Sequence, residues 1–192
     1  MQYEAIVMGV SAGGLLALSN ILEALPAGFE LPVIITQHRA KDERALLEEL
    51  LQLKCRVPVK EADEKERIAG GVVYMAPAGY HLLVEKDRSF SLSCDPPVNF
   101  SRPSIDVLFE TAAEVYEDRL LGIILTGANK DGATGIETIR NRGGMTIAQD
   151  PAEAQFPIMP QAAIATGSVQ HIFTLEEIKD FLSGIGEKSN AP

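Results

Sequence analysis

The sequence is poor in several features that would mark particular protein classes. Its two cysteines, Cys55 and Cys94, are too few for a disulfide framework, and neither lies in a CxxC pair. No run of about eighteen apolar residues occurs, so no membrane span is expected. The N-terminus also lacks the basic and apolar segments of a secretory signal. These absences suit a protein of the reducing cytoplasm.

Positive charge and metal-ligand patterns are also scarce. The formal net charge is −10, which disfavours nucleic acid as a partner because phosphates must be neutralised by a basic surface. The three histidines, at positions 38, 81 and 171, do not have the spacing of a zinc site. We therefore expect no nucleic acid, no metal and no cofactor. One stretch, QHRAKDER at residues 37–44, is locally basic.

The chain does contain a regular alternation of strand-like and helix-like segments. Such alternation predicts a doubly wound α/β fold, whose mostly parallel sheet has helices on both faces. The run from Gly70 to Cys94 reads as three short strands and predicts a short antiparallel insertion. We expect one domain over residues 1–185 and a mobile tail over 186–192. The expected strands cover residues 3–9, 32–38, 57–62, 119–127, 145–150 and 169–174, and the expected helices cover residues 13–25, 42–53, 104–116, 132–142, 159–165 and 175–182.

Three polar side chains follow strands of this predicted sheet. Ser11 follows the first strand in the turn GVSAGG, His38 ends the second, and Asp131 lies in TGANKDG after the most apolar strand. Sites in open α/β sheets form beyond the carboxyl ends of the strands. A serine, a base and an acid gathered there are the groups needed for nucleophilic acyl transfer.

Other acids and histidines are weaker candidates. Asp150 ends the MTIAQD strand on the same edge and is a rival to Asp131. His81 lies inside a strand pattern, which favours a structural role, and His171 falls at the amino end of its strand. Asp106 lies in the first turn of a helix, where the helix dipole favours a carboxylate.

The glycine-rich turn fits no cofactor motif well. GVSAGG lacks the G-x-G-x-x-G of a dinucleotide site and the GK[ST] of a P-loop. It matches the G-x-S-x-G of the α/β-hydrolase nucleophile elbow. That fold orders its triad as serine, acid, histidine and needs strands before the serine, whereas Ser11 leaves room for one strand.

Several ordered blocks resemble one family. GVSAGG, VIITQH, VKEADEKER, YMAPAGYH, RPSIDVLFE, GIILTGANKDGATG, GGMTIAQD and MPQAAI are similar, in this order, to the CheB-type chemotaxis-receptor methylesterase catalytic domain. The resemblance extends from Ile6 to Phe173. It covers the catalytic domain alone, without the N-terminal receiver domain that the family usually carries.

The resemblance implies a function and a set of residues. It implies a cytoplasmic serine hydrolase that removes methyl groups from glutamate γ-methyl esters on the cytoplasmic helices of chemotaxis receptors. The family also deamidates particular receptor glutamines. Its serine, histidine and aspartate correspond to Ser11, His38 and Asp131, the residues that strand position also selects. Backbone N–H groups at Ala12 and Ala128 correspond to its oxyanion donors.

The sequence departs from the family pattern at three places. Ala12 replaces the usual threonine, Ala128-Asn129 replaces Met-Gly, and Arg39 replaces methionine. Because Arg39 directly follows the proposed base, we expect it to reach the mouth of the site and to bind a substrate carboxylate. The same role is expected of Arg102, with help from Lys41 and Arg44. A small-molecule serine esterase of this fold and a catalytically impaired binding module remain alternative interpretations.

Overall fold

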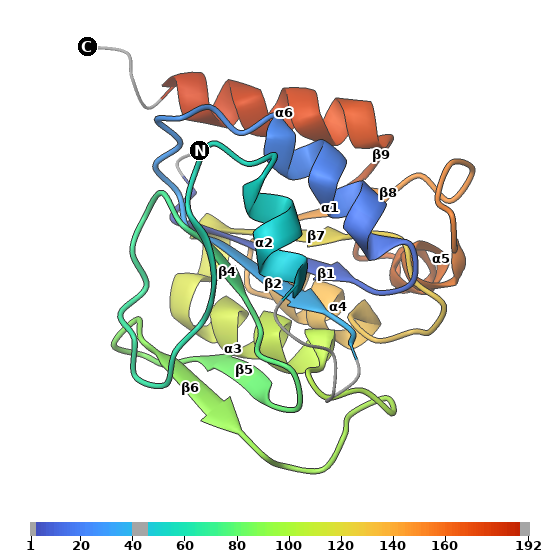
Figure 1. Ribbon diagram of the computed structural model, residues 1–192. Coiled ribbons are helices and arrows are strands. Elements are labelled where there is room, and N and C mark those ends of the chain that lie inside the picture. Colours follow the sequence, from blue (N-terminus) through green and yellow to red (C-terminus); the bar gives the residue numbers. More distant parts are fainter. Residues whose placement is uncertain (1–2, 40–45, 189–192) are drawn as a thin grey trace.

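A seven-stranded parallel sheet forms the centre of the protein (Figure 1). We describe a computed structural model over residues 3–39 and 46–188. The strand order is β3-β4-β2-β1-β7-β8-β9, with β1 in the middle. These strands are β1 (Ala5–Val10), β2 (Val33–Gln37), β3 (Val59–Glu61), β4 (Val73–Met75), β7 (Leu120–Ile124), β8 (Met145–Gln149) and β9 (His171–Phe173).

Helices cover both faces of this sheet (Figure 1). One layer contains α1, α2 and α6, and the other contains α3, α4 and α5. The central strand β1 is buried on both faces, with Ile6 and Met8 on the α1 side and Ala5 and Val7 on the α3 side. The predicted doubly wound α/β fold is thus confirmed. The helices are α1 (Gly14–Glu23), α2 (Leu46–Gln52), α3 (Ile105–Tyr116), α4 (Ala133–Asn141), α5 (Ile158–Ala165) and α6 (Leu175–Lys188), with a 3₁₀ turn at Glu117–Arg119.

The predicted antiparallel insertion is a separate hairpin of β5 (His81–Val84) and β6 (Phe90–Ser93). Leu82, Val84 and Phe90 pack against α3, so the hairpin extends the core on that side. One part of the prediction needs correction. The first of the three short strands expected between Gly70 and Cys94, now β4, pairs in parallel with β2 and β3.

Two helix ends differ from, or lie outside, the prediction. Helix α6 runs to Lys188 rather than Leu182, because Ile185 continues the apolar stripe that packs on the α1 side. Residues 186–188, which were assigned to a mobile tail, are therefore helical. The rest of that tail, and residues 42–45 of the helix expected over 42–53, lie outside the described residues.

The register of three neighbouring strands positions the site. In β1, Gly9 is paired with Thr36 of β2 on one side and with Ile124 of β7 on the other. The carboxyl ends of the three strands are therefore level. The loops that follow β1, β2 and β7 meet at one edge of the sheet.

Candidate active site

The turn after β1 presents the Ser11 side chain at this edge. The Ser11 N–H donates to Thr126 O at 3.0 Å, which joins the turn to the segment after β7. Gly13 has φ +78°, in the left-handed region that glycine adopts without a steric penalty. The chain thereby reverses within three residues and enters α1. Ser11 remains partly exposed at the start of this turn.

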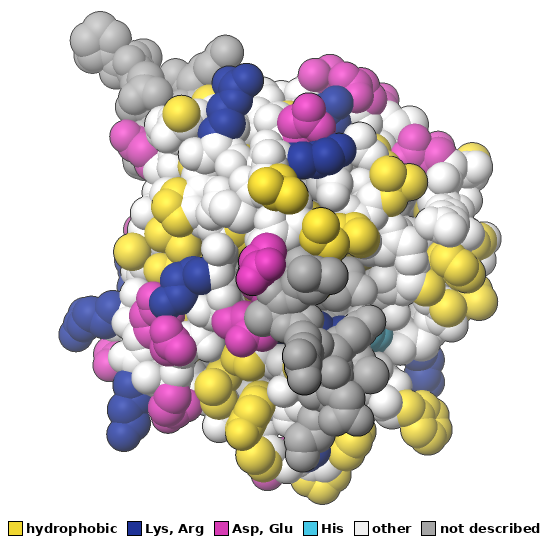
Figure 2. Space-filling model, in the orientation of Figure 1, with side chains coloured by type: hydrophobic (Ala, Val, Ile, Leu, Met, Phe, Trp, Pro, Cys, Tyr) yellow, Lys and Arg dark blue, Asp and Glu magenta, His cyan; other side chains and the backbone are white. Residues whose placement is uncertain are grey.

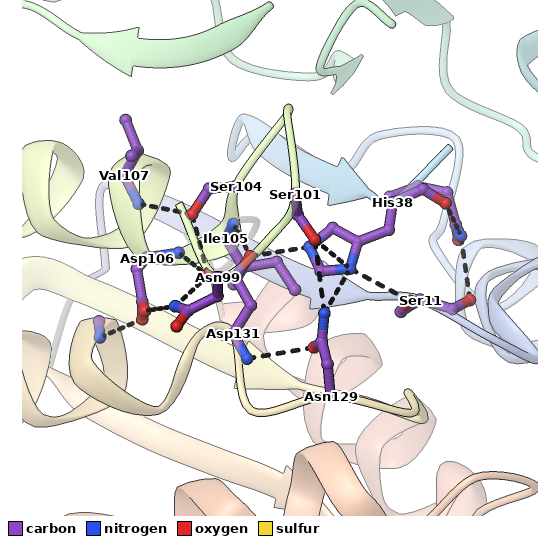
Figure 3. Close-up of polar contacts among 12 residues, drawn as sticks. Ser11, His38, Asn99, Ser101, Ser104, Ile105, Asp106, Val107, Asn129 and Asp131 are labelled. Atoms are coloured by element: carbon purple, nitrogen blue, oxygen red, sulfur yellow. Dashed lines mark hydrogen bonds and ion pairs between the residues drawn. The ribbon is translucent and has the colours of Figure 1, made fainter. Parts of the chain in front are cut away.

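His38 extends from the end of β2 toward Ser11. Its backbone N–H donates to Val10 O at 3.0 Å, so its main chain lies beside that of the serine turn. The Gln37 side-chain amide donates to Ser11 O and to His38 O, both at 3.0 Å. The His38 Nδ1 lies 3.1 Å from Ser11 Oγ (Figure 3). A serine hydroxyl can donate to a ring nitrogen at this distance.

Asp131 completes the relay on the other side of the imidazole. His38 Nε2 donates to Asp131 Oδ2 at 2.7 Å, and the aspartate is fully buried. Because Nε2 carries the donated proton, Nδ1 is free to accept from Ser11; this tautomer is assigned from the hydrogen bonds. Strand position predicted these three residues, and the structure brings them together.

The start of α3 holds the Asp131 carboxylate. The backbone N–H of Ile105 donates to Oδ2 at 2.6 Å, and the Ser104 hydroxyl donates to Oδ1 at 2.9 Å. Asn99 Nδ2 also donates to Oδ1, at 3.1 Å. Burial alone would raise the pKa of Asp131, but hydrogen bonds led by that from His38 outweigh it and lower the pKa. The carboxylate is therefore kept ionised, and it can stabilise an imidazolium.

Asp106 lies next to Asp131 in the first turn of α3. Its Oδ1 accepts from the Gly135 N–H at 2.8 Å, and its Oδ2 accepts from Asn99 at 2.8 Å. Burial raises the pKa of Asp106 to about 6, and the neighbouring charge of Asp131 contributes to the rise. Asp106 does lie in the first turn of its helix, as expected, and it is also a buried partner of the site.

Two further side chains approach His38 Nδ1. Ser101 Oγ and Asn129 Nδ2 each lie 3.4 Å from this nitrogen, and Asn129 Oδ1 accepts from the Asp131 N–H at 3.1 Å (Figure 3). Sequence reasoning missed these contacts and those of Asn99. RPSIDVLFE gave only a signal for a helix start at Ser104, and that cap is observed. The side-chain contacts of Asn99 and Ser101 arise from a loop fold that no periodicity reveals.

The predicted role of Arg39 is not supported by its surroundings. Its guanidinium is buried, donating to Glu48 Oε1 at 2.7 Å, to Glu61 Oε1 at 2.5 Å and to Ala76 O at 2.9 Å. The charge is already neutralised by two carboxylates, so it is not free to bind a substrate carboxylate. Arg39 does line the hollows beside His38, as expected, but its predicted bond to a substrate carboxylate is corrected. Lys41 and Arg44 lie outside the described residues.

Arg102 lies on the rim of a cavity that His38 also lines. Its guanidinium donates to Cys94 O at 2.6 Å and to Asp95 O at 2.9 Å, which positions it without neutralising its charge. The proposed oxyanion donors lie within the serine turn and the aspartate loop. Among the described residues, the backbone N–H of Ala12 and that of Ala128 form no hydrogen bond.

The rival residues have other partners. Asp150 Oδ1 accepts from the Ala152 N–H at 2.8 Å. His81 is buried, with its two ring nitrogens facing Pro96 O and the Ser104 N–H. His171 opens β9, at the amino end of that strand. Over residues 3–39 and 46–188, no cluster of three or more His, Cys, Asp or Glu side chains is arranged to hold a metal ion.

The geometry of this site agrees with the comparisons with known proteins. Residues 6–182 match the family described as CheB methylesterase. The chain belongs to this family. The crystal structure of the Thermotoga maritima CheB methylesterase catalytic domain superposes with a TM-score of 0.91, at 30% identity, over 96% of this chain and 100% of that chain. The resemblance proposed from the sequence blocks is confirmed.

Curated relatives carry the same two activities in their names. A Leptospira interrogans protein, provisionally named a protein-glutamate methylesterase/protein-glutamine glutaminase, is 52% identical over 94% of this chain and 93% of its own length. An Archaeoglobus fulgidus protein with that name is 39% identical over 92% of this chain. The match covers 53% of the Archaeoglobus protein, so this CheB-family chain spans about half the length of such relatives. None of the helices in the described part of the chain is long and apolar enough to cross a bilayer.

Proposed function

We propose that this CheB-family chain is a protein-glutamate methylesterase that uses Ser11 as its nucleophile. The substrates are glutamate γ-methyl esters on the cytoplasmic helices of chemotaxis receptors, and the protein acts in the cytoplasm. The observation that carries the proposal is the continuous relay from Ser11 Oγ through His38 to Asp131, at 3.1 and 2.7 Å. The catalytic domain of this proposal, first expected over residues 1–185, extends to the end of α6 at Lys188.

In the acylation half of the reaction, Ser11 Oγ attacks the ester carbonyl carbon as His38 Nδ1 takes the hydroxyl proton. Asp131 stabilises the imidazolium that forms, because its carboxylate accepts from Nε2 throughout. The carbonyl oxygen becomes an oxyanion, and the N–H groups of Ala12 and Ala128 are the proposed donors to it. Collapse breaks the bond to the methoxy oxygen, which leaves as methanol with the proton from Nδ1.

In the second half, water replaces methanol. His38 Nδ1 takes a proton from the water as its oxygen attacks the acyl-serine carbonyl. Collapse of this intermediate breaks the bond to Ser11 Oγ, which recovers its proton from Nδ1, and releases a glutamate side chain whose remaining acid proton passes to solvent. A glutamine side chain would follow the same steps with ammonia as the leaving group, so the proposed site also accommodates the glutaminase activity.

The test is methanol release from a methylated receptor fragment. Ser11→Ala should lower the rate by about four to six orders of magnitude, as the loss of a triad nucleophile does elsewhere. Ser183→Ala is the matched control. The Ser183 hydroxyl, on the remote helix α6, donates to Ala24 O at the end of α1, so its loss should leave the rate unchanged. Retention of more than about a tenth of the activity by Ser11→Ala would rule out Ser11 as the nucleophile. Faster turnover of short-chain esters than of the receptor fragment would favour a small-molecule esterase.

A further inference from the structure

A tight turn beside the active site has an unusual residue at its tip. Val98 and Ser101 exchange two backbone hydrogen bonds, at 3.1 and 2.9 Å, so Asn99 and Phe100 form a two-residue hairpin loop. Both loop residues have positive φ, +49° for Asn99 and +63° for Phe100. Turns of this kind favour asparagine at the first position and glycine at the second. A phenylalanine with positive φ is a genuine outlier.

Neither the turn nor the core accounts for this phenylalanine. Its side chain is fully exposed, so it contributes no buried apolar area to the fold. Glycine would occupy this left-handed position without the clash that a Cβ introduces. Strained residues of this type persist where a function requires them, and the observed strain at Phe100 prompts the search for one.

The residues on either side of Phe100 are attached to the catalytic relay. Asn99 donates to Asp131 and to Asp106, and Ser101 Oγ lies 3.4 Å from His38 Nδ1. These contacts hold the turn in place beside the base. Phe100 and His38 line the same cavity of about 450 Å³. The turn therefore places Phe100 at the rim of the site.

Apolar side chains also lie beside Ser11. Ser11 and His38 line a second hollow, of about 860 Å³, together with Leu15 and Leu16 of α1 and Leu50 of α2. These three leucines are exposed, and Figure 2 shows hydrophobic side chains over α1 and α2 on this face. Exposed apolar side chains thus lie in both hollows that His38 lines: Phe100 in the first, which Arg102 also lines, and the three leucines in the second.

We propose that Phe100 is a docking residue for the polypeptide substrate, contacting an apolar side chain one helical turn from the methylated glutamate. This inference rests on the proposed methylesterase function. On a helix, residues three or four positions apart share a face, so an ester that enters the site places such a neighbour over the rim. An uncharged aromatic ring suits an apolar neighbour, and the leucines in the hollow that Ser11 lines suit a second apolar residue of the same substrate.

The experiment compares two substrates and three variants. The substrates are a methylated receptor helix, assayed by methanol release, and p-nitrophenyl acetate, which has no helix to dock. Phe100→Gly should lower kcat/KM for the helix by about 10-fold or more, mainly through KM, as loss of an aromatic anchor does at interfaces. The loss on p-nitrophenyl acetate should be less than twofold. Phe100→Leu should restore most of the turnover, and Ile172→Ala, at an exposed apolar residue of β9, is the matched control.

Two further readouts separate docking from a structural role. Because Phe100→Gly removes the strain at positive φ, its Tm should rise by about 2–4 °C while turnover of the helix falls. Replacing the apolar substrate residue one turn from the ester by alanine should lower the kcat/KM of the wild-type protein by about the same 10-fold. That replacement should cost Phe100→Gly little, because the contact is already absent.

Each contrary outcome has a separate meaning. Equal losses on both substrates, or no loss on the helix, would overturn the docking role. So would dissociation of a dimer in Phe100→Gly by sedimentation, because the partner of Phe100 would then be a second copy of the chain. If the wild-type chain releases no methanol from the helix, the proposed function fails and the docking role fails with it. If wild type releases methanol from the helix and Phe100→Gly does so equally well, the docking role is refuted and the proposed function stands.

Discussion

The buried carboxylates of Asp106 and Asp131 share one hydrogen-bond donor, the side-chain amide of Asn99. Their pKa values move in opposite directions. That of Asp131 is lowered by hydrogen bonds led by His38, whereas burial raises that of Asp106 to about 6. Two adjacent carboxyl groups thus have different tasks: Asp131 stays ionised for the imidazole, and Asp106 takes up the proton that the pair binds in mild acid.

Asp106→Asn should change how stability depends on pH. The raised pKa of Asp106 contributes stability that is fully present below the unfolded value of 3.8 and is lost as pH rises through about 6. An asparagine at position 106 does not titrate, so the variant does not lose stability in this way as pH rises. Relative to wild type, the variant should therefore gain about 3 kcal/mol of unfolding free energy between about pH 4 and about pH 7.5, from two pKa units at about 1.4 kcal/mol each. Urea unfolding at both pH values measures the gain. Asp95→Asn, at an exposed aspartate, is the control, and a gain no larger than the control's would contradict the assignment.

Asn99→Ala should lower kcat about 10-fold and leave KM nearly unchanged. The substitution removes one donor from the Asp131 carboxylate, and a hydrogen bond to a charged group is worth about 1.5–3 kcal/mol. Steady-state methanol release measures both constants. Asn141→Ala, at an exposed asparagine that ends α4, should be silent. A rise in KM at constant kcat would mean that Asn99 contacts substrate instead of supporting Asp131.

His38 and Asp131 should behave as one unit with Ser11. His38→Ala alone should abolish nearly all triad catalysis, so adding Asp131→Asn should cost little more, because the effects of residues that act together are not additive. Single and double variants assayed for methanol release give the comparison. Losses that multiply would argue against a shared role. Greater damage from Asp150→Asn than from Asp131→Asn would mean that the carboxylate was chosen wrongly.

Arg39→Glu should destabilise the fold rather than alter substrate preference. The new carboxylate would face Glu48 and Glu61 in a buried position, and loss of a partner from a buried ion pair costs about 3–5 kcal/mol. Chemical unfolding measures the change. Arg142→Glu, at a half-exposed arginine 3.8 Å from Glu114, should cost about 1 kcal/mol or less. Normal stability with weakened, salt-sensitive turnover of the receptor helix would restore the substrate-binding role.

Most of the fold could be predicted from the sequence, because the strand and helix patterns that specify it are local. Alternating strands and helices required a parallel sheet, and residues at strand ends had to meet at one edge, which selected Ser11, His38 and Asp131. The side chains that surround these three residues could not be predicted as well. Arg39 follows the base directly in sequence, yet its guanidinium finds two carboxylates from α2 and β3 and becomes buried. Asn99 depends on the conformation of a loop, and no propensity predicts which distant groups such a side chain will reach.

The orientation of the His38 ring determines which of its nitrogens carries the proton bonded to Asp131 and which faces Ser11. In the Ser-His-Asp template the aspartate holds Nδ1 and the serine faces Nε2. Here the order is reversed, since Nε2 faces Asp131 and Nδ1 faces Ser11. A nitrogen-resolved proton spectrum should therefore assign the strongly hydrogen-bonded imidazole proton to Nε2. An inhibitor that first binds Ser11 and then alkylates the histidine should form its bond at Nδ1. Inhibitors designed to alkylate Nε2 should therefore react poorly with His38.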